Sequence, residues 1–546
     1  MKPDNKASEI IREYQLLTGD RGNFETHWKE IAERVIPSHK DMFMSQGRNG
    51  AGGEKKTEFI FDSTASIALG RFSAILDSLL TPRNQTWHRL MASDMNLNKV
   101  KEVRLWFDEI NRLLFKYRYA PKGNFASQNQ QNYKSLGAYG TGCMFVDELA
   151  DDIGLRYRNI HLAEIYFSEN HQGIVDKAIR YFKLDARQAI QKWGKKAPER
   201  CRAALGTNQN QDFEFLHCVK PRTDIDPSRK DYKGMPYGSY YVSIQDQSIV
   251  DEGGFTSFPY AISRYEQAPG EVYGRSPAMD VLPSIKTLNE QKKTMLKQGH
   301  RAVDPVLLAH DDGVLDSFSL KPGSINFGGI TADGTPLVQP LPVGSVAIGK
   351  EMMDEERNLI NDAFLITIFQ ILTESPQMTA TEVLERTKEK GILLAPTIGR
   401  QQSEYLGPLI EREIDVLTKQ RLIPPMPQAL IEAKGEYRIE YDSPLSRAQR
   451  AEEASGLMRT VETAIQVVNV TQDPSPLDYF DWDVIIPEMG TIQAVPERWM
   501  RSQEQVEEMR AGRAKQQEQQ QLIQAAPAAA AMIKAGAIAQ KNQAPR

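Results

Sequence analysis

The N-terminal part of the chain repeats a helical spacing of apolar residues. Three segments place apolar residues three and four positions apart: 7–17 (ASEIIREYQLL), 24–36 (FETHWKEIAERVI) and 63–80 (STASIALGRFSAILDSLL). The same spacing continues through residues 100–139. This pattern predicts helices over these segments, with a polar, glycine-rich loop at 45–58 between the second and the third.

The pattern then changes to the alternation that is typical of strands. It is clearest at 239–250 (SYYVSIQDQSIV) and 260–266 (YAISRYE), with one helical segment at 186–194. We therefore expect a mixed region of helix and strand over residues 154–271. Just before it, residues 137–145 (GAYGTGCMF) have a helix before their glycines and a strand after them, which predicts a helix C-cap and a tight turn. A dinucleotide-binding fingerprint needs the reverse order.

Two long helices enclose an insertion that is rich in Gly and Pro. The helices are predicted at 278–301 and 346–372, and the insertion at 302–345 has short strand-like runs between its breaks. The second helix is almost wholly apolar after Asp362, and a helix that is apolar all round needs neighbours on several sides. Packed antiparallel, the two helices form a hairpin with the insertion at its tip.

A short polar segment interrupts the apolar run at the end of the second helix. Residues 373–379 read TESPQMT, and Pro376 breaks the helix there. Thr379 and Glu382 then have the spacing of a capping box, which begins a new helix. This arrangement predicts a polar loop between two helices.

The last part of the chain begins after a proline-rich boundary at 424–427 (PPMP). A strand-like run at 437–441 (YRIEY) and a helical pattern at 446–468 follow it. From residue 497 onward the sequence is rich in Gln and Ala. Its most apolar run, 522–539, contains a proline and a lysine, so we do not expect it to cross a membrane.

Charged residues gather on the two long helices. The basic set is Lys286, Lys293, Lys297 and Arg301, and the acidic set is Glu351, Asp354, Glu355 and Glu356. The basic residues lie roughly opposite the apolar face of the first helix. They form a solvated face, contact DNA, or pair with the acidic set near the insertion, and the complementary signs favour pairing.

Composition and motifs argue against most enzyme classes. The chain is 40% hydrophobic and 25% charged with a net charge of −5, whereas proteins that hold nucleic acid tightly are usually basic. The loop GRNGAGGEKKT has Glu54 directly before Lys55, where a P-loop needs glycine. The three cysteines have no paired spacing and the eight histidines are scattered. We predict no catalytic residue, metal site or cofactor, although an enzyme with unrecognised site residues stays an alternative.

Three segments, in their order and spacing, carry a family resemblance. They are 61–90 (FDSTASIALGRFSAILDSLLTPRNQTWHRL), 273–293 (YGRSPAMDVLPSIKTLNEQKK) and 378–396 (MTATEVLERTKEKGILLAP). The sequence resembles, over nearly its whole length, the portal or head-to-tail connector proteins of short-tailed, podovirus-type bacteriophages. None of these segments is a catalytic motif.

The resemblance implies an α+β, mainly helical subunit that assembles as a ring, typically a dodecamer. The implied parts are a wing of helices and α/β structure at 1–277, stem helices at 278–301 and 346–372, a β-rich clip at 302–345, a channel loop at 373–379, further wing helices at 380–440, a helical crown at 441–496 and a C-terminal helical barrel or tail at 497–546. The channel loop (Thr373, Glu374, Ser375, Pro376, Gln377, Met378 and Thr379) is implied to face DNA in the axial tunnel. An ordinary turn on the outside of the ring is the alternative.

The function implied by the resemblance is structural. A portal ring at one capsid vertex would nucleate capsid assembly, conduct double-stranded DNA during packaging and ejection, and dock the terminase and then the tail adaptor and tail proteins. Scaffolding and major capsid proteins are further implied partners. The implied location is the virion, after assembly in the host cytoplasm. A capsid-associated enzyme, a packaging-motor subunit, or a scaffold or adaptor that only binds a portal are the alternatives.

Overall fold

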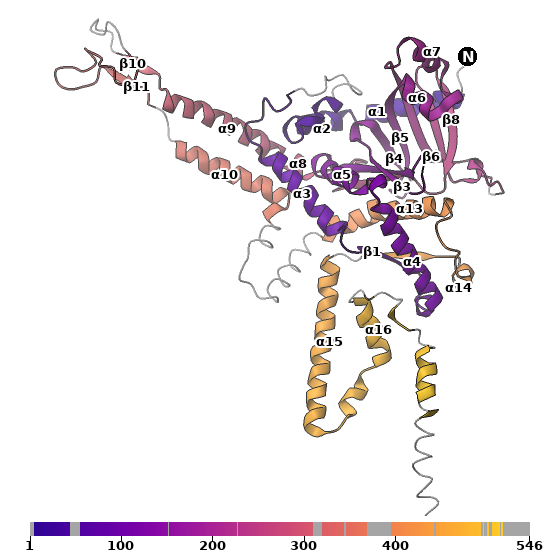
Figure 1. Cartoon of the computed structure of the whole chain (residues 1–546). Helices are drawn as coiled ribbons and strands as arrows, with labels where there is room; N and C mark the ends of the chain where they lie inside the picture. The colour runs from indigo at the N-terminus through magenta and orange to yellow at the C-terminus, as the bar shows by residue number, and fades with distance from the viewer. Residues whose placement is uncertain are drawn as a thin grey trace, which may run out of the picture. The chain divides into compact units, whose positions relative to one another are not determined.

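The chain divides into two compact units, which are described separately (Figure 1). The first unit comprises Met1–Trp87 and Leu113–Ile423, and the second comprises His88–Arg112 and Pro424–Arg546. The computed structural model describes residues 5–43, 55–150, 152–226, 228–309, 319–342, 346–367, 395–441, 444–492, 495, 499–501, 505–513 and 515–516. The predicted boundary at 424–427 coincides with the start of the C-terminal part of the second unit.

The predicted N-terminal helices are confirmed. They are α1 (Asn5–Asp20), α2 (Gly22–Arg34), α3 (Thr64–Leu80), α4 (Lys101–Arg118) and α5 (Phe125–Tyr139). Ile10 and Tyr14 of α1 pack into an apolar cluster with Ile179 and Leu216 of the larger sheet. Helical periodicity therefore located these elements because each has one face to bury.

The glycine at the end of α5 has the conformation that was predicted for it. Gly140 has a φ of +73°, and its N–H donates to the carbonyl oxygen of Leu136 at 2.9 Å. A Cβ atom on Gly140 would lie 2.3 Å from the carbonyl oxygen of Gly274, so only glycine fits. The helix therefore ends in a glycine C-cap, and the chain enters a strand at once.

Two antiparallel sheets form the α/β part of the first unit. The three-stranded sheet has the order β3-β2-β9 and the five-stranded sheet has the order β4-β5-β6-β7-β8. Their strands are β2 (Thr141–Glu148), β3 (Leu155–Asn159), β4 (Ile165–Glu169), β5 (Val175–Asp185), β6 (Asp212–Pro221), β7 (Tyr237–Ser243), β8 (Ser248–Phe255) and β9 (Tyr260–Arg264). In the smaller sheet Cys143 lies opposite Ile262, and Met144 lies opposite Asn159. The predicted mixture of strand and helix is confirmed.

Two helices connect β5 to β6. The segment predicted at 186–194 forms α6 (Ala186–Trp193), which begins with a capping box between Asp185 and Gln188. A second helix, α7 (Glu199–Thr207), was not predicted. It buries only Cys201 and Ala204, so its apolar face is too narrow to give a clear helical pattern.

The helix pair and its insertion also have the predicted order. A short helix, α8 (Pro277–Asp280), precedes α9 (Leu282–Val303), and the partner helix is α10 (Val346–Ala363). The strands β10 (Leu307–Ala309) and β11 (Val338–Pro340) pair antiparallel at the far end of α9 and α10 (Figure 1). We call α9, β10, β11, α10 and the described residues between them the arm.

The second helix of the arm is shorter than predicted. Helix α10 ends at Ala363, whereas the apolar pattern extended it to Leu372. Leu365 has a φ of +61°, a left-handed conformation that an α-helix does not contain. Phe364 and Ile366 are buried at this turn, where Phe364 packs against Phe72 of α3 with ring centroids 6.0 Å apart, and residues 366–367 are helical again. Residues 368–394 lie outside the described part of the chain.

A wide helical turn follows that gap. Residues 395–400 are helical, η7 (Gln401–Leu406) is a π-helix, and α13 (Gly407–Lys419) continues from it. Pro408 lies at the start of α13 and cannot donate a backbone hydrogen bond into the preceding turn. The π-helical turn accommodates this missing bond and the proline ring.

The second unit joins two segments that are distant in the sequence. Strand β1 (His88–Ala92) pairs antiparallel with β12 (Tyr437–Tyr441), which has the predicted bounds. The unit also contains the first part of α4, followed by α14 (Gln428–Glu432), α15 (Pro444–Thr471) and α16 (Trp482–Ile492). Short 3-10 helices complete both units: η1 (Pro37–Phe43), η2 (Leu97–Lys99), η3 (Pro121–Gly123), η4 (Leu162–Glu164), η5 (Gly194–Lys196), η6 (Tyr232–Gly234) and η8 (Ser475–Tyr479).

Candidate functional site

The arm is fastened to the segment that leads into α3. Arg357 of α10 donates to Oδ2 of Asp62 at 2.7 Å, and Oδ1 of Asp62 accepts from the N–H of Thr64 at 2.9 Å. Burial alone would raise the pKa of Asp62, but the hydrogen bonds from Thr64 and Arg357 outweigh it and hold that pKa below its ordinary value. A single carboxylate therefore caps α3 and holds α10.

The same segment also holds α9. The side chain of Asn289 accepts from the N–H of Phe61 at 2.8 Å and donates to the carbonyl oxygen of Phe59 at 3.1 Å. These bonds to the backbone fix the position of α9 without a charge. Residues 59–64 therefore hold both helices of the arm.

The two helices approach closely at a glycine. A Cβ atom on Gly349 of α10 would lie 2.5 Å from Sδ of Met295 on α9. Towards the α/β part, Ile285 and Leu288 of α9 and Ile360 of α10 are buried. The apolar side chains of the helix pair are therefore buried at the end of the arm that joins the α/β part of the unit.

The apolar surface of the arm is open at its other end. Phe327 is 86% exposed and Ile325 is 79% exposed, so the described residues do not bury either side chain. Other large apolar side chains exposed on the arm are Leu296, Val303, Val306, Leu308, Leu320, Ile330, Leu341, Met352 and Leu359. Exposed apolar side chains in such number are typical of a surface that another protein chain covers.

The predicted basic set is dispersed. Lys286 pairs with Glu30 of α2, and Lys293 lies 3.4 Å from Glu290 on its own helix. Lys297 and Arg301 are exposed, and neither has a carboxylate partner among the residues that the structure describes. The basic residues therefore have different environments and do not form one paired stripe.

The predicted acidic set does not pair with the basic set inside the chain. Asp354 pairs with Arg357 at 2.7 Å on its own helix. Glu351 and Glu355 are exposed, Glu356 is half-buried, and in the described part of the chain none of them pairs with the basic set. Within the described part of one chain the two sets do not meet, because Lys286 and Lys293 have carboxylates on α2 and on their own helix. Pairing between neighbouring subunits stays a prediction.

Comparison with known proteins identifies the family. A family model described as "Bacteriophage head to tail connecting protein" matches residues 7–501. The chain belongs to this family. The chain is 26% identical over 539 residues to the portal protein of Salmonella phage epsilon15, covering 96% of this chain and 94% of the relative. It is 27% identical over 496 residues to the probable portal protein of Bordetella phage BPP-1, covering 88% and 86%. The resemblance found in the sequence is confirmed.

A solved structure is also similar over most of its length. This structure is a chain of the virion of a native gene transfer agent particle. It is 10% identical in sequence, and the match covers 79% of the present chain and 94% of the solved chain, with a TM-score of 0.33. That score is too low to support a conclusion about the fold. The α+β class is confirmed by the elements described above, and ring assembly stays a prediction.

The channel loop predicted for this chain lies outside the described residues. This applies to all seven of its residues, 373–379, and to the helix that was expected to begin at Thr379. On the C-terminal side of this gap the chain is firmly held. Arg264 of β9 donates to both carboxylate oxygens of Glu404 in η7, at 3.0 and 3.1 Å. Tyr405 donates to Asn129 of α5 at 2.7 Å.

Sequence reasoning missed an ion pair that is completely buried in the described part of the chain. Arg118 of α4 and Glu413 of α13 both have fully buried side chains, and Nε of Arg118 lies 2.9 Å from Oε1 of Glu413. Tyr157 of β3 also donates to that oxygen at 2.6 Å. Burial would lower the pKa of Arg118, but the Glu413 carboxylate outweighs it and raises that pKa. No local sequence signal links residues so far apart in the chain.

The residues that the structure describes contain neither a cluster of metal ligands nor a membrane-spanning helix. Among those residues, no group of His, Cys, Asp and Glu side chains is placed to hold a metal ion. Within the same residues no helix has the length and apolar character needed to span a bilayer. Cys143, Cys201 and Cys218 are all buried as free thiols, and burial raises the pKa of each.

Proposed function

We propose that the chain is the subunit of a portal ring, typically a dodecamer, at one vertex of a phage capsid. DNA enters the capsid through this ring during packaging and leaves through it during ejection. The family match over residues 7–501 supports the proposal, as do the two phage relatives that cover most of the chain. The ring acts as a conduit and a docking platform and not as a catalyst.

The main structural support for assembly into a ring is the exposed apolar surface of the arm. Phe327 and Ile325 are largely exposed in the single chain, as are Leu308 of β10 and Leu320. A neighbouring copy would cover this surface in a ring, because each subunit then offers one side of the arm to the next subunit's other side. Strands as short as β10 and β11 also gain hydrogen bonds when another edge pairs with them.

The electrostatic balance of the chain suits a conduit. Each phosphate that a lysine or arginine neutralises adds affinity, and several such contacts make binding tight. A net charge of −5 per chain and few exposed basic residues on the arm, such as Lys297 and Arg301, limit this affinity. The loop at 373–379 contains no lysine or arginine, so it can face moving DNA without holding it.

Docking is the second part of the proposed function. The clip, 302–345, would bind the terminase during packaging and the tail adaptor and tail proteins afterwards. The wing would contact scaffolding and major capsid proteins, so that the ring nucleates capsid assembly in the host cytoplasm and remains at the portal vertex of the virion. The exposed clip residues support docking because they offer apolar surface that a partner can bury.

Electron microscopy of the purified full-length chain tests the ring. We expect closed rings whose symmetry is measured before it is imposed, and no ATP hydrolysis or DNA cleavage by the protein alone. Monomers at all concentrations, together with either activity, would reject the portal function and favour a subunit of the packaging motor.

Deleting Glu374 to Met378 tests the conduit separately. We expect rings that still assemble, because the described residues up to 367 and from 395 onward already fold without the deleted segment. Particles built with these rings should package DNA incompletely or lose it afterwards, which a nuclease-protection assay of filled heads measures. Stably filled, fully infectious particles would show that the loop does not face DNA.

A further inference from the structure

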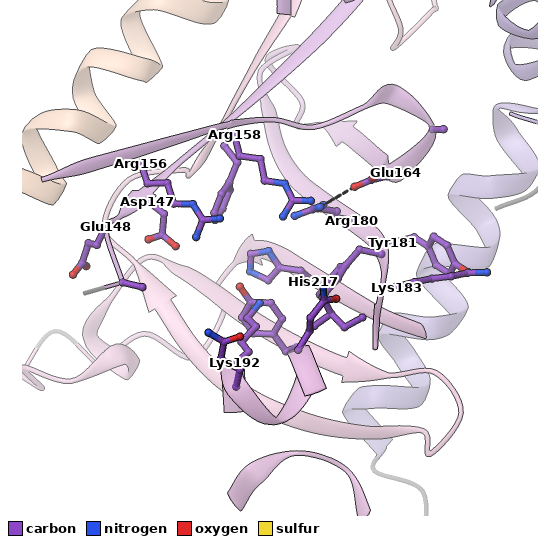
Figure 2. A pocket seen from close by; sticks show the side chains of 18 of the residues that line it. Asp147, Glu148, Arg156, Arg158, Glu164, Arg180, Tyr181, Lys183, Lys192 and His217 are labelled. Atoms are coloured by element: carbon purple, nitrogen blue, oxygen red, sulfur yellow. Dashed lines mark hydrogen bonds and ion pairs between the residues drawn. The ribbon is translucent and has the colours of Figure 1, made fainter. Parts of the chain in front are cut away.

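A large pocket lies between the two sheets of the first unit, away from the arm (Figure 2). It has a volume of about 870 Å³ and is lined by β2, β3, β5, β6, β7 and α6. This volume lies in the range of about 300–1,000 Å³ that is typical of sites for small ligands. The proposed portal function gives this pocket no role.

Basic side chains enter the pocket from three elements. Arg158 comes from β3, Arg180 from β5 and Lys192 from α6, and Figure 2 shows Arg158 and Arg180 meeting on one side with Lys192 on the other. Arg180 is buried and binds Glu164 at 2.8 Å. Lys192 lies over the ring of Tyr241, with its Nζ 3.8 Å from the ring centroid. Arg156 of β3 and Lys183 of β5 also line the pocket, so five cations surround one space.

Each acidic residue of the pocket already lies near a cation, and for Glu164 that cation is the pocket's own Arg180. Glu164 binds Arg180, Glu148 binds Lys419 at 2.5 Å, and Asp147 lies 3.9 Å from Arg412. By contrast, neither Arg158 nor Lys192 has a carboxylate within ion-pair distance among the residues that the structure describes. The pocket therefore has positive charge that the described residues do not balance.

The titration behaviour of these groups agrees with that excess of positive charge. Burial, followed by the nearby Arg180, lowers the pKa of Lys192 to about 8. The same two causes, in the same order, lower the pKa of Arg158. The charged form of each side chain is thus destabilised in the pocket. A bound anion would stabilise the charged forms of both Lys192 and Arg158.

The aromatic residues of the pocket favour a ligand that is recognised by its charge. The ring of Tyr241 is stacked on His217 at 4.2 Å on one side and covered by Lys192 on the other. It is therefore not free to stack on a planar ligand. Most strands that line the pocket are paired on both edges, so a peptide could not add to them as another strand.

We propose that this pocket binds a phosphate compound with at least two negative charges, held between Arg158, Arg180 and Lys192. Planar guanidinium groups bind phosphate oxygens in pairs, and a lysine adds a mobile point charge. The phosphate groups come either from a free compound, such as a nucleoside triphosphate, or from a single strand of nucleic acid that reaches into the pocket.

Calorimetric titration of the assembled, full-length protein with inorganic triphosphate at pH 7 tests the site. We expect saturable binding at one site per chain. Arg158→Gln and Lys192→Gln should each weaken it at least about tenfold, since each removes a charge-assisted hydrogen bond. The matched control is Arg187→Gln, which removes an exposed charge from the same helix as Lys192 but outside the pocket, and should bind as the native protein does.

A pH series separates binding by Lys192 from a general effect on folding. The groups that act on Lys192 are Arg180 on β5, Asp147 on β2, Arg158 on β3 and Asp251 on β8. Native binding should weaken, relative to Lys192→Arg, as the pH rises past about 8, because lysine loses its proton there and arginine does not. Identical pH profiles for the two proteins would overturn the role of Lys192.

Competition identifies the source of the phosphate. Displacement of triphosphate by a short oligothymidylate indicates a nucleic-acid strand, and displacement by ATP but not by the oligonucleotide indicates a free compound. The proposal is overturned if the native protein shows no saturable binding up to millimolar triphosphate. It is also overturned if both pocket variants bind as Arg187→Gln does, or if hexaglutamate binds more tightly than triphosphate.

Discussion

The sheets of the first unit and the arm use apolar residues in opposite ways. In the sheets, apolar side chains such as Ile179, Leu216 and Val242 are fully buried within the chain. In the arm, side chains of the same kinds, such as Leu320 and Ile325, are mostly exposed. The sheets therefore bury their apolar residues within one folded chain, whereas in the proposed ring a neighbouring chain would cover those of the arm. Under that proposal, one sequence contains a region for folding and a region for assembly.

Removing one partner of the buried ion pair should produce the largest effect on the folded body. Arg118→Met leaves Glu413 charged and buried, which we expect to lower the free energy of unfolding by about 3–5 kcal/mol. Denaturation in urea measures this change. The double variant Arg118→Met, Glu413→Leu should recover much of the loss, and a single variant as stable as the native chain would contradict the account.

A matched pair of leucine truncations tests the comparison directly. Leu216→Ala in the sheet should cost about 2–5 kcal/mol, because it leaves a cavity in a packed core. Leu320→Ala in the arm should change subunit stability by less than about 0.5 kcal/mol, since that side chain is exposed. Sedimentation should show the converse, with weaker ring assembly in Leu320→Ala. Equal losses of subunit stability would remove the distinction between the two regions.

The ion pair between Lys286 and Glu30 should matter least to stability. Both side chains are substantially exposed, so Lys286→Gln should cost no more than about 1 kcal/mol. Changing Lys297 instead should leave stability unaltered and change DNA retention, if that face lines the channel. Rings that weaken strongly with Lys297→Gln would show that this residue pairs between subunits.

Asp62 gives the attachment of the arm a dependence on pH. Its folded pKa lies below the unfolded value of about 3.8, so its stabilising contribution is present above that value and is lost as the pH falls through the folded pKa. Asp62→Asn should therefore lower the melting temperature at pH 6 and have a smaller effect below pH 3.8. An equal effect at both pH values would show that the charge of Asp62 is unimportant.

Local patterns predicted local structure well and distant contacts poorly. The helices of the N-terminal part, the cap at Gly140 and the strand at 437–441 all follow from neighbouring residues. The end of α10 was wrong because an apolar run does not show where a chain turns, and Leu365 turns it. The pairing of β1 with β12 was missed because its two strands are far apart in the sequence.

In the candidate site, too, the local features were predicted from the sequence and the distant contacts were not. The order of helix, insertion and helix was visible in the sequence, but the ion-pair partners of Lys286 and Arg357 were not. Those partners, Glu30 and Asp62, belong to other elements that packing brings near the arm. The charge excess of the pocket was also hidden, because it depends on which carboxylates already bind other cations.

The hydrogen bonds between Arg264 and Glu404 have a mechanical consequence. A pull on the chain near residue 400 reaches both bonds at once, since the two nitrogens of one guanidinium hold the two oxygens of one carboxylate. Bonds loaded in parallel must break together, whereas bonds loaded in series open one at a time. The strand that bears this load, β9, is itself paired along its length with β2. Tension at residue 400 is therefore shared by a whole sheet.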